Sequence, residues 1–374
     1  MVKPEFRRLP LVVESTEGNY IISGGKRYLD ISGSAMTVGY NFLDKLPSPV
    51  SLLVYNNVYT KELTDKLTKI SGFENVAYAT SGTEACDAAL SRWERPIISL
   101  EGSYHGLSHL TYRVSNGSGI DIKNSIIHLK VDKRRDQVED PIEYNEGLLK
   151  EAKADMNLEE AIIIFEPIQS DGGMLVISEE FLKYIKEKVW EFNLKVIIDE
   201  VYTGFGRSGY ILYSKKLDIK PDMVCLGKGM AAGLPSGAVL YNGEWDLPYH
   251  GALSMQGGNM ATSFASLKVL DFLTEEKLLG VREQGEMVIR EIRKINSPHV
   301  FEVRGKGYMI GIEVGDKDRF DHEKANEIRK KLYENGVIIT LVGKHNNIIK
   351  ITPPLTITQS GILTLIEKLK VAIS

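Results

Sequence analysis

The chain has 374 residues, of which 43% are hydrophobic and 26% are charged. This composition excludes the disordered and fibrous classes and predicts a folded protein with a large core. The formal net charge of -4 comes from interspersed acids and bases, which excludes the basic face that nucleic acid or anionic lipid would require.

Residues 1–40 lack the pattern of a cleaved leader, because no sustained apolar stretch precedes a small-residue cleavage site. They contain two strand patterns, at 18–22 and 27–31, which are joined by a turn at 23–26. We expect this N-terminal segment to pack on a smaller domain formed by the other end of the chain.

Residues 41–260 predict a large domain with a mainly parallel sheet. Apolar runs rich in Val and Ile alternate with helical patterns such as 84–93 and 178–193. Such runs are typical of strands buried on both faces, and the alternation indicates parallel strands with crossover helices. The runs occupy residues 76–80, 96–100, 161–167, 195–200 and 222–227.

Residues 261–374 predict the smaller α/β domain. A long helical pattern at 265–295 is followed by short strand patterns and by a final helix at 357–373. No segment of the chain is apolar over the length that a membrane-spanning helix needs. The two cysteines, Cys86 and Cys225, show no metal-ligand spacing, so we predict no metal and a reducing, cytoplasmic setting.

A lysine and an aspartate stand at the ends of two predicted strands. Lys228 lies between two glycines, which let the backbone turn sharply and approach a bound ring. Asp199 closes the strand pattern KVIID, where a buried carboxylate is costly unless a cation faces it. Each residue also has an ordinary interpretation, as a loop lysine and as a helix cap or structural ion pair.

Two other loops after predicted strands offer a phosphate cradle and an aromatic ring. Ser81, Gly82 and Thr83 open a helix, where backbone N–H groups and the helix dipole bind phosphate. Ser81 also begins an ordinary capping box, which is the competing interpretation. Tyr104 can stack on a planar ring, whereas His105 beside it can be a hydrogen-bonding residue without a catalytic task.

Together these residues match what pyridoxal phosphate (PLP) chemistry requires of a protein. It needs a lysine for a Schiff base, an acid at the pyridine nitrogen, a phosphate cradle and a flat partner for the ring. All four groups follow predicted strands, where open parallel sheets bind ligands. We therefore predict that Lys228 holds the cofactor as an internal aldimine and that Asp199 faces the pyridine nitrogen.

The segment GFGRSG, residues 204–209, matches a dinucleotide-binding fingerprint and favours a different class of protein. Two acids precede it where a pyrophosphate would approach, and the following YILYS has the pattern of a strand rather than of a helix. These features argue against a dinucleotide site. A non-catalytic α/β protein remains the alternative outside PLP chemistry.

At these residues the sequence resembles the class III aminotransferases of the ornithine and ω-amino acid type, which are PLP enzymes of fold type I. The resemblance implies a seven-stranded type of sheet in the large domain and a homodimer with shared active sites. The motifs that carry it are SGTEA, SYHG, FEPIQSDGG, VIIDEVYTGFGRSG, PDMVCLGKGMAAGLPSGAV, QGGN, VRGKGYMIGIEV and ITPPLTIT. The cofactor contacts that it implies are Ser81, Gly82, Thr83, Tyr104, His105, Glu166, Asp199, Val201, Tyr202 and Lys228.

The reaction that the resemblance implies is ping-pong transamination. An amine or amino acid, of an ω-amino or similar type, would displace Lys228, and the freed lysine would move the proton. A keto acid would then accept the amino group. An aminomutase like that of glutamate-1-semialdehyde is the main alternative, and a racemase or decarboxylase on the same fold stays open.

Departures from the family pattern concern the substrate. The arginine that usually follows the aromatic-x-Gly segment is Leu107, and Arg113 is a candidate substitute. The family's gate between an acid and an arginine falls on Asp171 and Lys350, which we predict to form an ion pair. Because lysine lacks the bidentate fork of arginine, carboxylate recognition should be weaker or arranged otherwise.

Two cofactor contacts also depart from the family. Tyr202 replaces a glutamine that reaches the cofactor's phenolic oxygen, and Met255 replaces a threonine that reaches the partner subunit's phosphate. Ser254 or the backbone near Gln256 is the candidate for that second contact.

Overall fold

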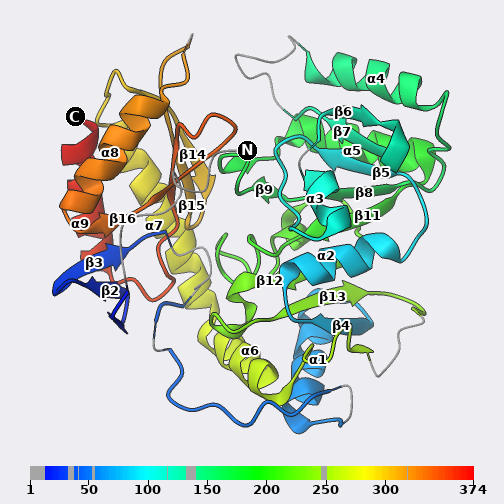
Figure 1. Cartoon of the computed structure of the whole chain (residues 1–374), viewed down its shortest axis with the longest axis horizontal. Coiled ribbons are helices and arrows are strands. Elements are labelled where there is room, and N and C mark those ends of the chain that lie inside the picture. The colour runs from blue at the N-terminus through cyan, green and yellow to red at the C-terminus, as the bar shows by residue number, and fades with distance from the viewer. Residues whose placement is uncertain are drawn as a thin grey trace.

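The computed structural model describes residues 13–32, 38–40, 42–52, 55–115, 117–131, 140–245, 251–317 and 319–374. Figure 1 shows two parts side by side, a large sheet covered by helices and a smaller part that holds the C-terminus. No helix within these ranges has the length and apolar character needed to cross a membrane.

The large part is built on an eight-stranded sheet, which confirms the predicted α/β fold class. Its strand order is β4-β13-β12-β11-β8-β5-β7-β6. All strands run parallel except β13 and β6, which are antiparallel to their neighbours. The three-residue β6 is an extra edge strand that the sequence pattern did not indicate. The strands are β4 (Asn75–Ala79), β5 (Ile97–Leu100), β6 (Gly119–Asp121), β7 (Ile126–Leu129), β8 (Ile162–Phe165), β11 (Lys195–Asp199), β12 (Met223–Gly227) and β13 (Gly237–Tyr241).

Helices and short turns connect these strands. Helix α5 has a side-chain cap at its N-terminus, where the Ser178 hydroxyl accepts the N–H of Phe181. It ends at Asn193, whose backbone is in the left-handed region. The elements are α1 (Val58–Ser71), α2 (Gly82–Ser91), α3 (His109–Ser115), η2 (Ile122–Asn124), α4 (Pro141–Ala152), the hairpin β9 (Ile168–Gln169) and β10 (Leu175–Val176), α5 (Glu179–Phe192), η3 (Tyr213–Lys216) and η4 (Lys228–Ala231).

The long helical pattern at 265–295 forms two helices rather than one. Helix α6 (Met260–Phe272) ends before Thr274. Thr274 is the N-cap of α7 (Glu275–Arg293), because its hydroxyl accepts the N–H of Lys277. These helices lead from the large part into the smaller one (Figure 1). There the antiparallel sheet β14-β15-β18-β17 packs with α7 and α8 (His322–Glu334), and α9 (Gln359–Ile373) packs against these two helices. Its strands are β14 (Val300–Lys306), β15 (Met309–Val314), β17 (Thr340–Val342) and β18 (Ile348–Ile351).

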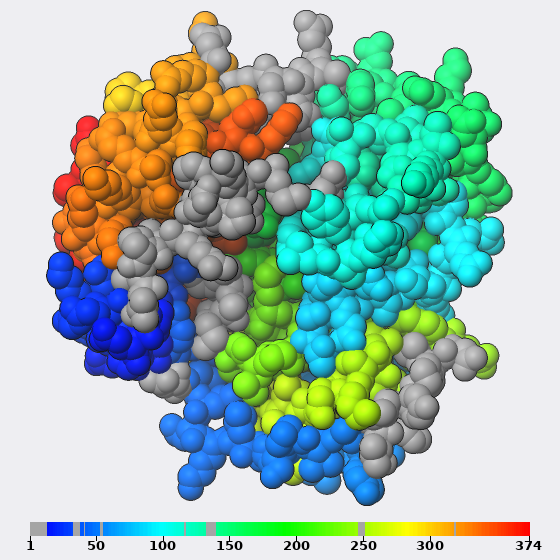
Figure 2. Space-filling view, viewed as in Figure 1, coloured from blue at the N-terminus to red at the C-terminus, as the bar shows by residue number. Residues whose placement is uncertain are grey.

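The N-terminal strands lie against the C-terminal part. The strands β1 (Ser15–Glu17), β2 (Tyr20–Ser23) and β3 (Lys26–Asp30) form one sheet with β16 (Val337–Ile338), which pairs with β3 in parallel. Figure 2 shows the blue N-terminal residues directly beside the orange C-terminal ones. Division of the chain at residues 40 and 260 stays a prediction.

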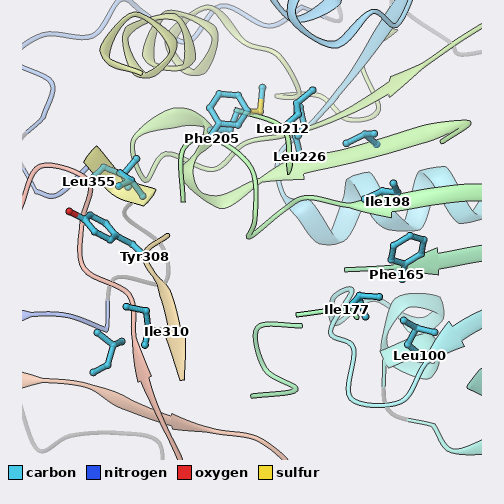
Figure 3. Packing of buried hydrophobic residues seen from close by; sticks show 14 of the residues in the cluster. Leu100, Phe165, Ile177, Ile198, Phe205, Leu212, Leu226, Tyr308, Ile310 and Leu355 are labelled. Atoms are coloured by element: carbon cyan, nitrogen blue, oxygen red, sulfur yellow. The ribbon is translucent and has the colours of Figure 1, made fainter. Parts of the chain in front are cut away.

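One hydrophobic cluster runs through both parts. It includes Ile198 and Phe165 on the large sheet and Ile310 and Tyr308 in the C-terminal part, with Phe205 also in the cluster (Figure 3). Polar contacts join the same parts, because the Arg207 guanidinium donates to the Pro353 carbonyl and the Arg304 Nε donates to the Gly173 carbonyl at 3.0 Å. Segments next to these contacts line the candidate site.

Candidate active site

The predicted residues meet at one edge of the large sheet. Asp199 ends β11, Lys228 follows β12, and the two strands are parallel neighbours. Tyr104 follows β5, and Ser81 follows β4 at the same edge. The carboxyl ends of parallel strands therefore bring a lysine, an acid, a ring and a helix start together.

Lys228 has an uncommon backbone conformation. Its φ of 45° lies in the left-handed region, which a side chain other than glycine rarely adopts outside functional or strained sites. A Cβ at the preceding Gly227 would lie 3.0 Å from the Gly82 Cα, so glycine favours this close approach of the two backbones. Among the described residues the Lys228 ammonium makes no hydrogen bond or ion pair and lies 4.6 Å from the Tyr202 ring centre.

Asp199 is held in place by three donors. Its Oδ1 accepts the Val201 N–H at 2.9 Å, and its Oδ2 contacts His105 Nδ1 at 2.7 Å and Cys86 Sγ at 3.4 Å. The residue is only 2% exposed. A carboxylate fixed in this way is suited to face a cationic ring nitrogen in the adjoining cavity.

Cys86, His105 and Asp199 place three potential metal-ligand atoms within 4.8 Å of one another. The sequence spacing gave no sign of this cluster. Hydrogen bonding with Cys225, burial and the charge of Asp199 raise the pKa of the Cys86 thiol well above its ordinary value. The thiol therefore stays protonated and acts as a donor to Asp199 rather than as a thiolate ligand.

The start of α2 forms one wall of a cavity of about 310 Å³ beside Asp199 and Lys228. The Ser81 oxygen accepts the Glu84 N–H at 3.1 Å, so the predicted cap is present, and its own proton stays available to a phosphate. Gly82 packs on Val201, because an added Cβ would lie 2.4 Å from Val201 Cγ1. Gly106 packs equally closely on Thr83, because an added Cβ at Gly106 would meet the Thr83 side chain.

The predicted contact to a partner subunit lies on the surface near α2. Ser254 Oγ donates to Glu84 Oε2 at 3.2 Å, while Met255 and Gln256 are exposed. Glu84 also accepts the Thr80 N–H at 2.6 Å, so it fixes this loop relative to the phosphate cradle.

Glu166 is buried beside Tyr104. Its two oxygens accept the N–H groups of Tyr104 at 2.8 Å and Ser170 at 3.1 Å. Burial and the charge of Asp199 raise the pKa of its carboxyl to about 7. Glu166 is therefore partly protonated near neutral pH.

A second cavity of about 290 Å³ lies on the other side of Lys228. Lys228 and Tyr104 line both cavities. The C-terminal wall of this second cavity could not be predicted from the sequence, because it comes from α8, β17 and the loop before β18 and carries no motif. The residues of that wall are His322, Arg329, Thr340, Leu341, Val342, Gly343 and Asn346.

The predicted ion pair between Asp171 and Lys350 is wrong in this structure. Both residues line the second cavity, but no ion pair joins them within the described ranges. Lys350 Nζ instead donates to Ser170 Oγ at 3.2 Å and lies 4.3 Å from the Tyr202 ring centre. The sequence gave the correct neighbourhood but could not tell which of two adjacent side chains reaches the lysine.

Two other substrate candidates lie away from the second cavity. Leu107 is 69% exposed, and the Arg113 guanidinium donates to Asn124 at the end of η2. Neither is among the described residues that line that cavity. Arg113 is therefore not placed to replace the family arginine.

The GFGRSG segment packs as a compact turn rather than around a ligand. A Cβ at Gly206 would meet Leu273 at 2.6 Å, and one at Gly209 would meet Arg282 at 2.3 Å. The segment YILYS, predicted as a strand, instead leads into the short helix η3. A dinucleotide site still lacks the α-helix that it needs.

Comparison with known proteins agrees with this geometry. A family model described as aminotransferase class-III matches residues 1–373. The chain belongs to the class-III aminotransferase family. It is a PLP-dependent transaminase by family, and the lysine, acid and helix start around the first cavity fit that cofactor.

Members of the family with printed activities are similar over nearly the whole chain. An alanine/serine racemase from Pyrococcus horikoshii is 30% identical, covering 93% of this chain and 80% of its own. An ornithine aminotransferase from Staphylococcus carnosus is also 30% identical, covering 98% of this chain and 95% of its own. The structure of adenosylmethionine-8-amino-7-oxononanoate aminotransferase from Methanocaldococcus jannaschii matches with a TM-score of 0.79 and 26% identity. The match covers 98% of this chain and 93% of the other.

Proposed function

We propose that this transaminase moves an amino group from an amine or amino acid to a keto acid through Lys228, in two half-reactions that share one site. The observation that carries the proposal is the position of Lys228 between the two cavities. One cavity has the acid and the helix start that suit PLP. The other has a buried cation, Lys350, which suits an acidic substrate.

Each residue has a distinct task in this scheme. Bound PLP would supply an electron sink through its protonated ring. Asp199 holds a negative charge at one end of its cavity, and His105 and Cys86 fix the direction of that carboxylate. Lys228 would carry the proton to and from the reacting substrate carbon, since among the described residues it is the basic group that borders both cavities.

The test is the visible absorbance of protein loaded with PLP. A band near about 410 to 430 nm is expected for a lysine-bound cofactor, and an amino donor should remove it until a keto acid is added. Lys228→Ala should abolish the band. Lys220→Ala, at an exposed lysine just before β12, is the matched control and should retain it. A band that persists in Lys228→Ala would contradict the proposal.

The proposed class of amino donor is based on the printed activities of the relatives. The printed names of ornithine and acetylornithine aminotransferases support an ω-amino donor. The alanine/serine racemase favours a second candidate, an enzyme that acts on the α-carbon of an amino acid without a keto acid. Turnover that requires a keto acid excludes the racemase and the aminomutase.

A homodimer is part of the proposal. Support comes from exposed apolar side chains near the phosphate cradle, namely those of Leu107 and Met255. The exposed loop at residues 254–256 is the segment proposed to reach a partner's phosphate. Sedimentation of wild type and of Met255→Asp tests this assembly. The reducing, cytoplasmic setting also stays a proposal, supported by the buried free thiols of Cys86 and Cys225.

A further inference from the structure

Two buried imidazole nitrogens behind Asp199 have no hydrogen-bond partner. They are His105 Nε2 and His128 Nδ1, and within the described part of the chain no atom bonds either of them. The two histidines are only 2% and 1% exposed. Buried polar groups are normally hydrogen-bonded, because an unsatisfied one has lost its contacts to water. Each nitrogen therefore needs a partner that the described residues do not supply.

His128 points toward the face of the large sheet that α2 and α3 cover. It lies two residues after Ile126 in β7, so both side chains leave the strand on the same side. Ile126 packs in one buried cluster with Cys86 of α2 and Val114 of α3. Gly117, just after α3, closes this space, because an added Cβ there would lie 1.8 Å from His128 Nε2. The imidazole is thus held beneath α3.

His105 reaches the same space from the loop after β5. Its backbone N–H donates at 2.7 Å to the hydroxyl of Ser115, the last residue of α3. Its ring directs Nδ1 at Asp199 Oδ2, so Nε2 faces away from that carboxylate. The charge of His105 contributes to the pKa of His128, which places the two rings within electrostatic reach of each other. The two nitrogens therefore border one buried space without bonding each other directly.

His128 acts through hydrogen bonding rather than through charge. Burial lowers the pKa of its imidazole to about 4, while Asp121 opposes this effect and His105 adds to it. The ring is therefore neutral near neutral pH, and its Nδ1 can donate or accept a hydrogen bond. A water molecule can bridge two such nitrogens, since a buried water normally makes roughly two to four hydrogen bonds to polar groups.

We propose that His128 is a positioning residue for Asp199. A buried water bridges His128 Nδ1 and His105 Nε2 and donates a hydrogen bond to His105 Nε2. That bond keeps the His105 proton on Nδ1, from where it is donated to the Asp199 carboxylate. The other tautomer would set a nitrogen lone pair against the carboxylate, and Asp199 would lose a donor. This inference rests on the proposed role of Asp199 toward the pyridine nitrogen.

Nitrogen NMR of the full chain with isotope-labelled histidine tests the bridge, both without PLP and with it. Signals that vanish in His105→Gln and in His128→Leu assign the two rings. In wild type, His105 should carry its proton on Nδ1 and have an unprotonated, hydrogen-bonded Nε2. In His128→Leu, part of the His105 population should carry the proton on Nε2 instead. A protonated His105 Nε2 in wild type would overturn the inference, and this arm needs no variant.

Rescue by a conservative variant separates positioning from packing. The amide of His128→Asn lies near the place of Nδ1, so this variant should restore the wild-type tautomer of His105, which the apolar His128→Leu cannot do. Equal disturbance of His105 in the two variants would show that His128 only fills space, and the inference would be lost. An unchanged His105 tautomer in His128→Leu would contradict it as well.

Cofactor affinity gives an independent readout. His128→Leu should weaken PLP binding about tenfold in an absorbance titration of the apoprotein, because one hydrogen bond is worth about that factor. His128→Asn should stay within about twofold of wild type, as should His299→Leu, the control at a histidine before β14. Unchanged PLP affinity in His128→Leu would overturn the inference. If wild type never forms the absorbance band, the proposed function fails instead, and the NMR of the PLP-free protein still decides the role of His128.

Discussion

The two cavities on either side of Lys228 differ in how completely their polar groups are satisfied. In the first, Asp199 has three donors and Ser81 caps a helix. In the second, Lys350 has no anion within the described residues and contacts the Ser170 hydroxyl and the Tyr202 ring. A permanently bound cofactor requires polar groups that the protein already holds in place. A substrate that binds and dissociates can itself supply the partners of the polar groups in its site.

The largest expected effect comes from neutralising the acid of the first cavity. Asp199→Asn keeps the shape of the side chain but removes its charge, so kcat should fall roughly a hundred- to a thousandfold. Steady-state kinetics at saturating PLP measures the loss. Asp218→Asn, at an exposed aspartate, is the control. Activity within about tenfold of wild type would show that the charge of Asp199 is not used.

A smaller effect is expected from disturbing the phosphate cradle. Gly82→Ala would place a Cβ 2.4 Å from Val201 Cγ1, so α2 or Val201 must shift. PLP affinity should fall about tenfold, as measured by absorbance titration of the apoprotein. Gly280→Ala in α7 meets no atom within 4 Å and should stabilise the protein by about 0.5 to 1 kcal/mol. Unchanged PLP affinity in Gly82→Ala would show that α2 or Val201 can shift without disturbing the phosphate cradle.

The second cavity should behave in the opposite way. If Lys350 is an uncompensated buried cation, Lys350→Met should raise the free energy of unfolding by about 1 to 2 kcal/mol while it damages activity. Urea denaturation of the apoprotein measures the gain, and Lys220→Met at an exposed lysine should be neutral. A loss of stability in Lys350→Met would mean that the cation is already compensated.

The pH dependence of stability tests the raised pKa of the Glu166 carboxyl. The pKa of Glu166 is raised from 4.5 to about 7, so between these pH values the folded state holds more protons than the unfolded state. The free energy of unfolding therefore loses a contribution as pH rises through this range. Relative to wild type, Glu166→Gln should become more stable from pH 4.5 to about 7 and then level off. A difference that does not vary with pH would refute the raised pKa.

The two cavities were also unequally predictable. Lys228, Asp199 and Ser81 each stand directly after a strong strand pattern, and parallel strands place such residues at one edge. Strand β13 was not anticipated, yet it leaves this edge intact because β4 and β12 run in the same direction on either side of it. The helix break at Thr274 and the turn before η3 were missed, because capping and packing decide them locally.

Sequence alone thus predicted the fold class and several residues of the first cavity, because both depend on short motifs and strand order, whereas Gly233 to Ser236 of its wall were not predicted. Only the tertiary structure decided the second cavity. Its walls come from segments as far apart as Ser170 and Lys350, and their side-chain directions depend on how the C-terminal part packs. The sequence therefore predicted a pairing of Lys350 with Asp171, whereas in the structure the lysine contacts the Ser170 hydroxyl and the Tyr202 ring.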